Sequence, residues 1–166
     1  MSPRDPLERS LVGPAGEHFV LYQLYRRGLL AALAPPGVPE VDIIVLDQHQ
    51  VVRVGIQVKA RTKGRDGGWH MRRKHQGLRS PQLYYAFVDF EPNIPITYII
   101  PSAVVAQLLE ASHRAWLGAL GARGQPHRDH DMRRVQPMYP HPWPGYASNW
   151  LEKYRDDWAQ LADPSS

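Results

Sequence analysis

The chain has 166 residues, of which 43% are hydrophobic and 22% charged, and its formal net charge is +4. These values suit one domain with one core and exclude a disordered chain; with no bilayer-length apolar run and no signal-like opening, we expect a cytoplasmic protein without a membrane partner. The absence of cysteine removes disulfides and thiolate ligands, so any bound metal should be a hard one.

The first predicted element is a helix over residues 13–27, preceded by a polar arm of ten residues. Gly28 stands where a helix-ending glycine belongs. The apolar stripe of this helix carries Glu17 at its N-terminal end. An acid in that position either has a partner in the core or is stabilised by the positive end of the helix dipole.

Three predicted strands follow, and their side-chain alternation defines two faces. The strands are 29–35, 41–46 and 51–60, and residues 47–50 form a hairpin between the second and the third. In the third strand the apolar face is Val52, Val54, Ile56 and Val58. Gln57 and Lys59 lie on the opposite face, and the hairpin pairing would bring Asp42 beside them. Glu40, two residues earlier, would be a spare ligand on the same face.

The rest of the chain predicts more strands and helices. Residues 69–74 suit a short strand or irregular edge, 83–90 a central strand and 97–100 another. Ser102 would cap a helix reaching Glu110 or Trp116. Residues 118–146 are rich in proline and glycine and predict irregular structure, and Asn149 would cap a last helix to Leu161.

These elements indicate an α/β fold with a central mixed sheet flanked by helices, a proline-rich C-terminal extension and a terminal helix. We expect residues 1–110 to form the core and 111–166 an extension packed on it, within a single domain. His127 and His130 have a spacing that zinc sites use, but without a third ligand we interpret them as part of a polar loop. His113 and Trp116 suit a packing pair at a helix end.

Basic residues concentrate directly after Lys59. Eight cations and one acid fall between Lys59 and Arg79, a local excess of +7 that would attract a phosphate backbone. The alternative is a solvated hairpin whose charges keep a sheet edge soluble. The candidate nucleic-acid contacts are Arg61, Lys63, Arg65, Arg72, Arg73 and Lys74.

The order of Glu17 in a helix, Asp42 in a strand and Gln57-Val58-Lys59 in the next strand resembles the PD-(D/E)XK nuclease superfamily, in particular members with glutamine in the last motif. The resemblance covers residues 13–109 and implies a restriction-endonuclease-like core that binds Mg²⁺ or Mn²⁺. It also implies that Asp42 is the principal metal ligand, Gln57 a second ligand, the Val58 carbonyl a further contact, Lys59 the catalytic lysine and Glu17 the helix acid.

The resemblance predicts a metal-dependent endonuclease that hydrolyses DNA phosphodiester bonds, and two cuts or a symmetric substrate would suit a homodimer. Because Gln57 is neutral, a degenerate nuclease fold that binds nucleic acid or a protein without cleavage is the first alternative. A structural interaction protein that uses its aromatic tail is the second.

Overall fold

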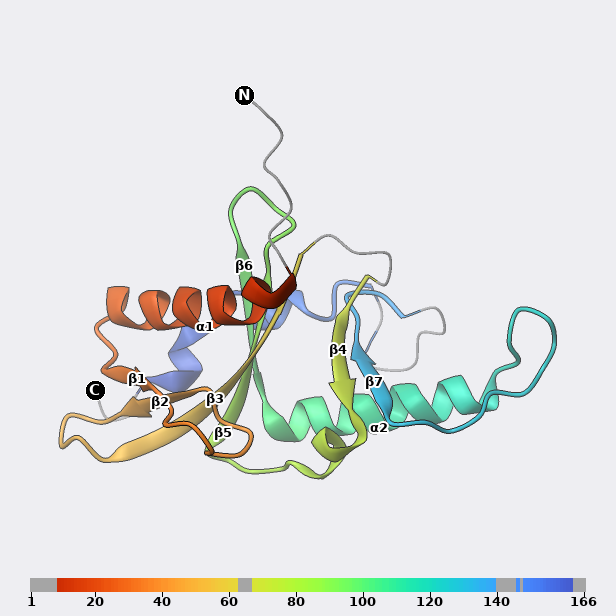
Figure 1. Cartoon of the computed structure of the whole chain (residues 1–166), viewed down its shortest axis with the longest axis horizontal. Coiled ribbons are helices and arrows are strands. Elements are labelled where there is room, and N and C mark those ends of the chain that lie inside the picture. The colour runs from red at the N-terminus through yellow and green to blue at the C-terminus, as the bar shows by residue number, and fades with distance from the viewer. Residues whose placement is uncertain (1–8, 63–66, 140–145, 147, 163–166) are drawn as a thin grey trace.

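The computed structural model describes residues 9–62, 67–139, 146 and 148–162, and it contains a five-stranded sheet and a smaller two-stranded one (Figure 1). The elements are α1 (Arg9–Arg26), β1 (Ala31–Leu33), β2 (Ile43–Leu46), β3 (Val52–Arg61), β4 (Trp69–Arg72), η1 (Arg73–Gly77), β5 (Leu83–Asp89), β6 (Ile96–Pro101), α2 (Ser102–Gly118), β7 (Met132–Val135), η2 (Glu152–Tyr154) and η3 (Trp158–Leu161), where η denotes a 3-10 helix.

The main sheet is mixed, as the sequence predicts. Its order is β1-β2-β3-β5-β6, with β3 and β5 parallel and every other neighbouring pair antiparallel. β4 and β7 form a separate antiparallel pair, which we call the β4–β7 ribbon. The α/β fold with helices flanking a central mixed sheet is therefore confirmed. None of the helices in the described ranges is long and apolar enough to cross a membrane.

Each face of the sheet buries its own core. The first core joins α1 to the sheet and contains Val20, Leu24, Ile43, Val45, Val54, Ile56, Val58, Ala86, Val88, Ile99, Trp158 and Leu161, among others. The second lies against α2 and the ribbon and contains Trp69, Met71, Tyr85, Phe87, Ile100, Val105, Leu108, Leu109, Val135, Trp150 and Leu151, among others. The second core includes residues of β5 and β6 but none of β1, β2 or β3, so it covers the β5–β6 part of its face.

The α1 helix ends where the glycine signal predicts. Gly28 has a φ of 73°, and its N–H donates to the Tyr25 carbonyl while the Leu29 N–H donates to the Leu24 carbonyl. This left-handed cap satisfies carbonyls that the last turn leaves open. The helix begins earlier than expected, at Arg9, so Arg9 and Ser10 belong to α1 rather than to an arm, while residues 1–8 lie outside the described residues.

The predicted terminal α-helix is wrong. Two 3-10 segments, η2 and η3, replace it, because Asn149 and Asp156 have left-handed φ values of 70° and 49°. The reason is packing: Trp150 belongs to the second core and Trp158 to the first, and one straight helix cannot serve both faces of the sheet. The aromatic side chains are buried docking contacts, as expected.

Three smaller expectations also need correction. Ser102 does not cap α2; it is the first helical residue, and its buried hydroxyl donates to the Ser80 carbonyl at 2.8 Å and accepts from the Ser80 N–H at 3.0 Å. The segment predicted as irregular contains β7. Val52 lies outside the core, with 53% of its surface exposed, because it sits at the hairpin end of β3.

Candidate metal and phosphate site

Asp42 lies at the corner where β2 begins beside β3. Its N–H donates to the Ile56 carbonyl at 2.9 Å, and its Oδ2 accepts from the Val58 N–H at 2.7 Å. β2 begins at Ile43, so Asp42 stands just before the paired register and is tied to β3 by these two hydrogen bonds. The Asp42 carboxylate also acts to raise the pKa of Lys59, so these two predicted site residues lie near each other.

Glu17 reaches this corner because α1 lies unusually close to β3. A Cβ added at Gly16 would stand 2.6 Å from the Ala60 Cβ, so only glycine permits the contact. Burial, followed by the Asp42 carboxylate, raises the pKa of Glu17, while the positive charge of Lys59 acts to lower it. The side chains of Glu17 and Lys59 thus lie near enough to the Asp42 carboxylate for its charge to act on both.

Lys59 is half-buried and has no fixed partner among the described residues. Burial lowers the pKa of Lys59, and the Asp42 and Glu40 carboxylates act to raise it. No hydrogen bond or ion pair of its ammonium with the described part of the chain is present. An ammonium group that lies near two acids without a direct ion pair can bind a ligand without first breaking a bond to the protein.

Gln57 is buried, with 8% of its surface exposed, and its Oε1 has no hydrogen-bond partner. A buried acceptor without a hydrogen bond is destabilising, and a bound ion or ligand at this position would satisfy it. The Val58 N–H points towards β2, and in an antiparallel pair a residue directs its carbonyl to the same side.

Carboxylate, amide and carbonyl oxygens are the donors that Mg²⁺ takes, and one or two carboxylates suffice because the ion keeps several waters. The residues present therefore fit a hard divalent metal. They do not fit a metal that needs a denser set of protein ligands, because no group of three His, Asp or Glu side chains suited to a metal occurs in the described ranges.

A second polar network borders this corner; sequence reasoning named Glu40 as a spare ligand and Lys74 as a phosphate contact, but it did not connect them to His75 and Tyr85. The Glu40 Oε1 accepts from the Lys74 Nζ at 2.6 Å, and the His75 Nδ1 lies 2.8 Å from the Tyr85 hydroxyl. Burial, followed by the positive charge of Lys59, lowers the pKa of His75 to about 4. Glu40 has a left-handed φ of 61°, and its buried Oε2 has no hydrogen-bond partner but lies 3.8 Å from the His75 Nδ1. No local sequence signal marks this network, because its members come from three separate segments: the loop before β2, η1 and β5.

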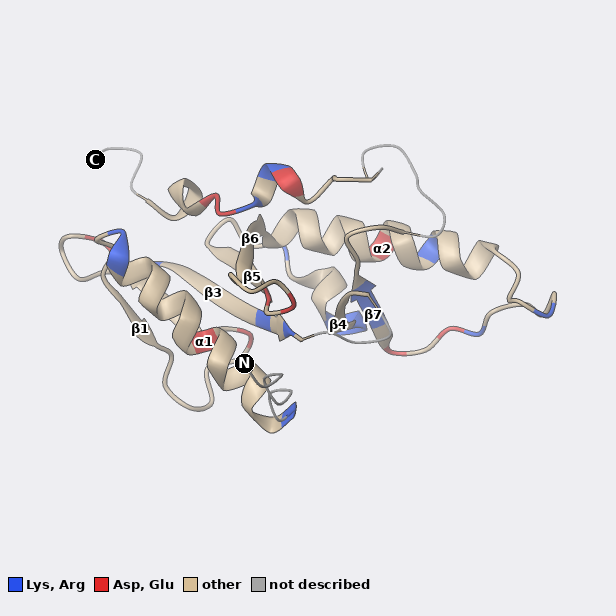
Figure 2. Ribbon diagram, turned by 90° about the horizontal axis from the view of Figure 1, so that it is seen from above, with Lys and Arg blue, Asp and Glu red and all other residues tan. Residues whose placement is uncertain are grey.

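The predicted phosphate contacts fall into three groups, and Figure 2 shows basic positions at the end of β3 and on the ribbon. Arg61 forms an ion pair with Asp89 at 2.6 Å, and the side chains of Arg61 and Asp89 are 15% and 10% exposed. The Arg61 guanidinium also stacks over the Trp69 ring. Lys63 and Arg65 lie outside the described residues. Arg72, Arg73 and Lys74 are exposed, and each pairs with an acid: Asp131, Asp129 and Glu40 respectively.

One hollow in the described structure lies away from this corner. It is a cavity of about 330 Å³ between α2 and β7, and its walls include Trp116, His130, Arg133 and Tyr139. His127 stacks on Trp116 with ring centroids 4.0 Å apart, and His113 stacks on Trp116 at 5.4 Å. The packing interpretation of His113 and Trp116 is therefore confirmed.

The fold has a counterpart among solved structures. I-Ssp6803I, a bacterial homing endonuclease, is similar with a TM-score of 0.50 and 10% sequence identity, over 93% of this chain and 91% of that chain. This likeness shows a nuclease-like fold. No protein-family model matches the chain, and no curated protein sequence does.

Proposed function

We propose that the protein is a divalent-metal-dependent nuclease of the PD-(D/E)XK type that acts on DNA. Asp42, Gln57 and the Val58 carbonyl would hold Mg²⁺ or Mn²⁺, with Lys59 as the catalytic lysine and Glu17 as the helix acid. The observation that carries the proposal is the Gln57 Oε1, a buried oxygen without a hydrogen-bond partner on the strand that also carries Lys59 and is tied to Asp42 through the Val58 N–H.

The reaction would be hydrolysis of one P–O ester bond by water, which leaves a phosphate on one fragment and a hydroxyl on the other. A bound divalent ion supplies charge neutralisation and lowers the pKa of water. Lys59 would orient the attacking water or contact the phosphate, because its ammonium is half-buried and lacks a fixed partner in the described structure. Glu17 would accept hydrogen bonds from water at the rim of the site.

Cleavage of labelled DNA duplexes in Mg²⁺, in Mn²⁺ and in EDTA tests the proposal. We expect metal-dependent cleavage that falls by about 100-fold or more in Asp42→Ala and in Lys59→Ala. Lys153→Ala, which removes an exposed lysine on η2, is the matched control and should cleave normally. Full activity in both site variants would refute the assignment. RNA duplexes and sedimentation analysis would test the DNA preference and the proposed homodimer.

Binding without cleavage is the second candidate, and the neutral Gln57 together with the sparse acid set favours it. This candidate predicts DNA affinity that falls steeply with salt, weakens in Arg72→Ala, Arg73→Ala and Lys74→Ala, and never leads to a cut with either metal. Metal-dependent cleavage by the unmodified protein would exclude it.

A further inference from the structure

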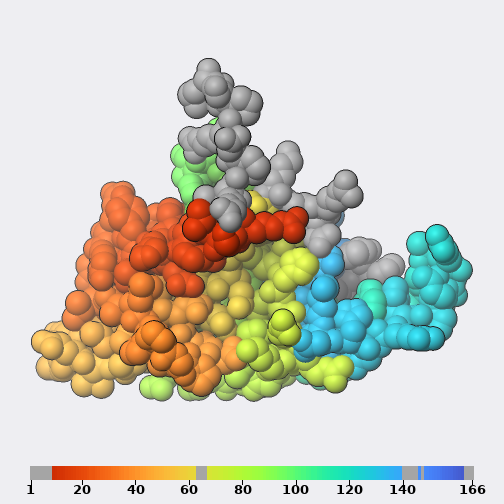
Figure 3. All heavy atoms as spheres, viewed as in Figure 1, coloured from red at the N-terminus to blue at the C-terminus, as the bar shows by residue number. Residues whose placement is uncertain are grey.

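Arg72, the last residue of β4, and Arg73, the first residue of η1, lie beside an acidic turn that precedes β7. β4 pairs with β7 in antiparallel register, and Asp129 and Asp131 precede β7. The Arg72 guanidinium lies 3.2 Å from the Asp131 Oδ2, and the Arg73 guanidinium lies 2.7 Å from the Asp129 Oδ2. In the space-filling view the yellow-green surface of β4 and η1 borders the blue surface of β7 (Figure 3).

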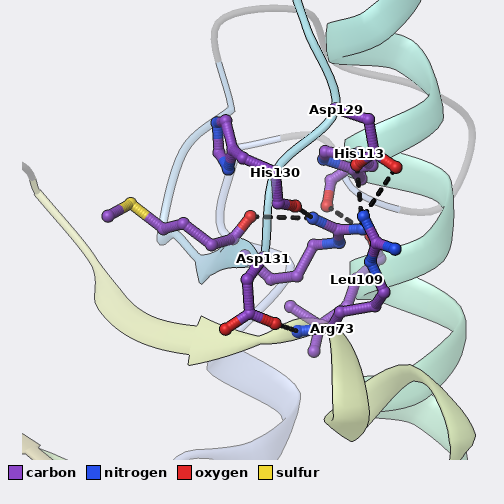
Figure 4. Close-up of polar contacts among 9 residues, drawn as sticks. Arg73, Leu109, His113, Asp129, His130 and Asp131 are labelled. Carbon is purple, nitrogen blue, oxygen red and sulfur yellow. Dashed lines mark hydrogen bonds and ion pairs between the residues drawn. The ribbon is translucent and has the colours of Figure 1, made fainter.

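The two acids are held in place by contacts that do not involve the exposed guanidinium groups. The Asp129 Oδ1 lies 2.8 Å from the His113 Nε2 on α2 and 3.5 Å from the buried Arg133. The Arg73 N–H donates to the Asp131 carbonyl at 2.8 Å and to its Oδ1 at 3.2 Å. Figure 4 shows Asp129 and Asp131 with Arg73 between them. The turn is therefore fixed by α2 and the backbone.

The arginine side chains, in contrast, are free to change partner. Arg72 and Arg73 are 73% and 55% exposed, and ion pairs at such exposure contribute little to stability. A backbone phosphate presents anionic oxygens that match the guanidinium donors as a carboxylate does. Its binding to the arginines would also release counterions from the nucleic acid.

We infer that Asp129 and Asp131 occupy phosphate positions on the β4–β7 ribbon, so that this acidic turn competes with nucleic acid for Arg72 and Arg73. This inference rests on the proposed function. The acids lower the affinity for any phosphate chain, because each arginine must leave its carboxylate before it can pair with a phosphate. Lys74 joins the two regions, because its partner Glu40 belongs to that corner.

Fluorescence anisotropy with a labelled DNA duplex in EDTA, titrated with KCl, tests the inference. The variant is Asp129→Asn with Asp131→Asn, because asparagine keeps the acceptor oxygens that face His113 and the Arg73 N–H. The control is Glu110→Gln with Glu152→Gln, which adds the same two charges by neutralising exposed acids paired with Arg79, Arg114 and Arg155.

We expect the aspartate variant to bind about tenfold more tightly near physiological salt, with a salt dependence steeper by about 1–2 in the log–log slope, since each freed arginine adds about 0.9. The control should shift affinity by less than about twofold. Asp131→Asn alone keeps the Asp129 network intact and should give about half the change in slope, which guards against a ribbon that fails to fold.

Equal affinity in the aspartate variant and the control, or weaker binding in the aspartate variant, would overturn the inference. If the unmodified protein still binds and cleaves DNA in that case, the proposed function stands and only the competition fails. If no version binds DNA at low salt, both the inference and the proposed function fail.

Discussion

The Asp42 corner and the β4–β7 ribbon are both rich in polar groups, but some of those at the corner lack hydrogen-bond partners whereas the exposed arginines at the ribbon are paired. At the corner the Gln57 Oε1 and the Glu40 Oε2 are buried without hydrogen-bond partners, and Lys59 has no fixed contact in the described structure. On the ribbon Arg72 and Arg73 each meet an acid at ion-pair distance. Buried oxygens without hydrogen-bond partners can accept a ligand directly. The paired surface arginines must first release their carboxylate partners before they can bind a ligand.

The largest difference in stability that we expect is between the buried Arg61–Asp89 ion pair and the exposed Arg72–Asp131 ion pair. Asp89→Ala should lower the free energy of unfolding by about 3–5 kcal/mol, because it leaves the buried Arg61 without a countercharge. Asp131→Ala should cost less than about 1 kcal/mol, because its pair with Arg72 is exposed. Urea unfolding measures both. Equal losses of unfolding free energy in the two variants would show that burial does not set the contribution of these ion pairs. As a control, Arg61→Met added to Asp89→Ala should recover part of the stability that Asp89→Ala loses.

A smaller effect comes from His75, whose pKa burial lowers to about 4. The unfolded chain takes up this proton near pH 6.5 and the folded chain only near pH 4, so stability is fully present above pH 6.5 and falls as pH drops through that window. The loss should be on the order of 3 kcal/mol. His75→Gln keeps a partner for Tyr85 but does not titrate. Parallel pH–stability curves for the variant and the unmodified protein would contradict the prediction.

Gln57→Leu separates function from stability. We expect cleavage to fall by about 100-fold, equivalent to about 2.7 kcal/mol, while the free energy of unfolding changes by less than about 1 kcal/mol, because the amide oxygen loses no partner. Gln160→Leu is the converse control. Its amide donates to the Ile99 carbonyl and to the Asp157 carboxylate, so that variant should lose about 1–3 kcal/mol of stability and keep its cleavage.

The features that sequence reasoning could predict are local ones. Strand alternation placed Gln57 and Lys59 on one face, and the turn residues 47–50 predicted the hairpin, in which the Asp47 carboxylate accepts from the His49 and Val51 N–H groups. Both depend on residues near one another in the chain.

What the sequence could not predict depends on distant partners. The apolar and polar residues of β7 alternate too weakly for the sequence to predict a strand. β7 forms because β4, some 60 residues earlier, provides an edge with which it can pair. The +7 cluster was visible, but the acids that neutralise Arg72 and Arg73 come from that same distant segment. A charge count along the chain does not reveal which charges are already paired in space.

The smallest effect concerns the glycine that brings Glu17 to the corner. Gly16→Ala should lower the free energy of unfolding by about 1–3 kcal/mol, because its Cβ would stand 2.6 Å from the Ala60 Cβ and push α1 away from β3. Gly118→Ala, at the last residue of α2, also has nothing within 4 Å of the added Cβ, so it should raise stability by up to about 1 kcal/mol through helix propensity. Thermal unfolding of the two variants measures the difference in sign. If both variants gained stability, α1 would not depend on this close contact, and the position of Glu17 beside Asp42 and Lys59 would need another explanation.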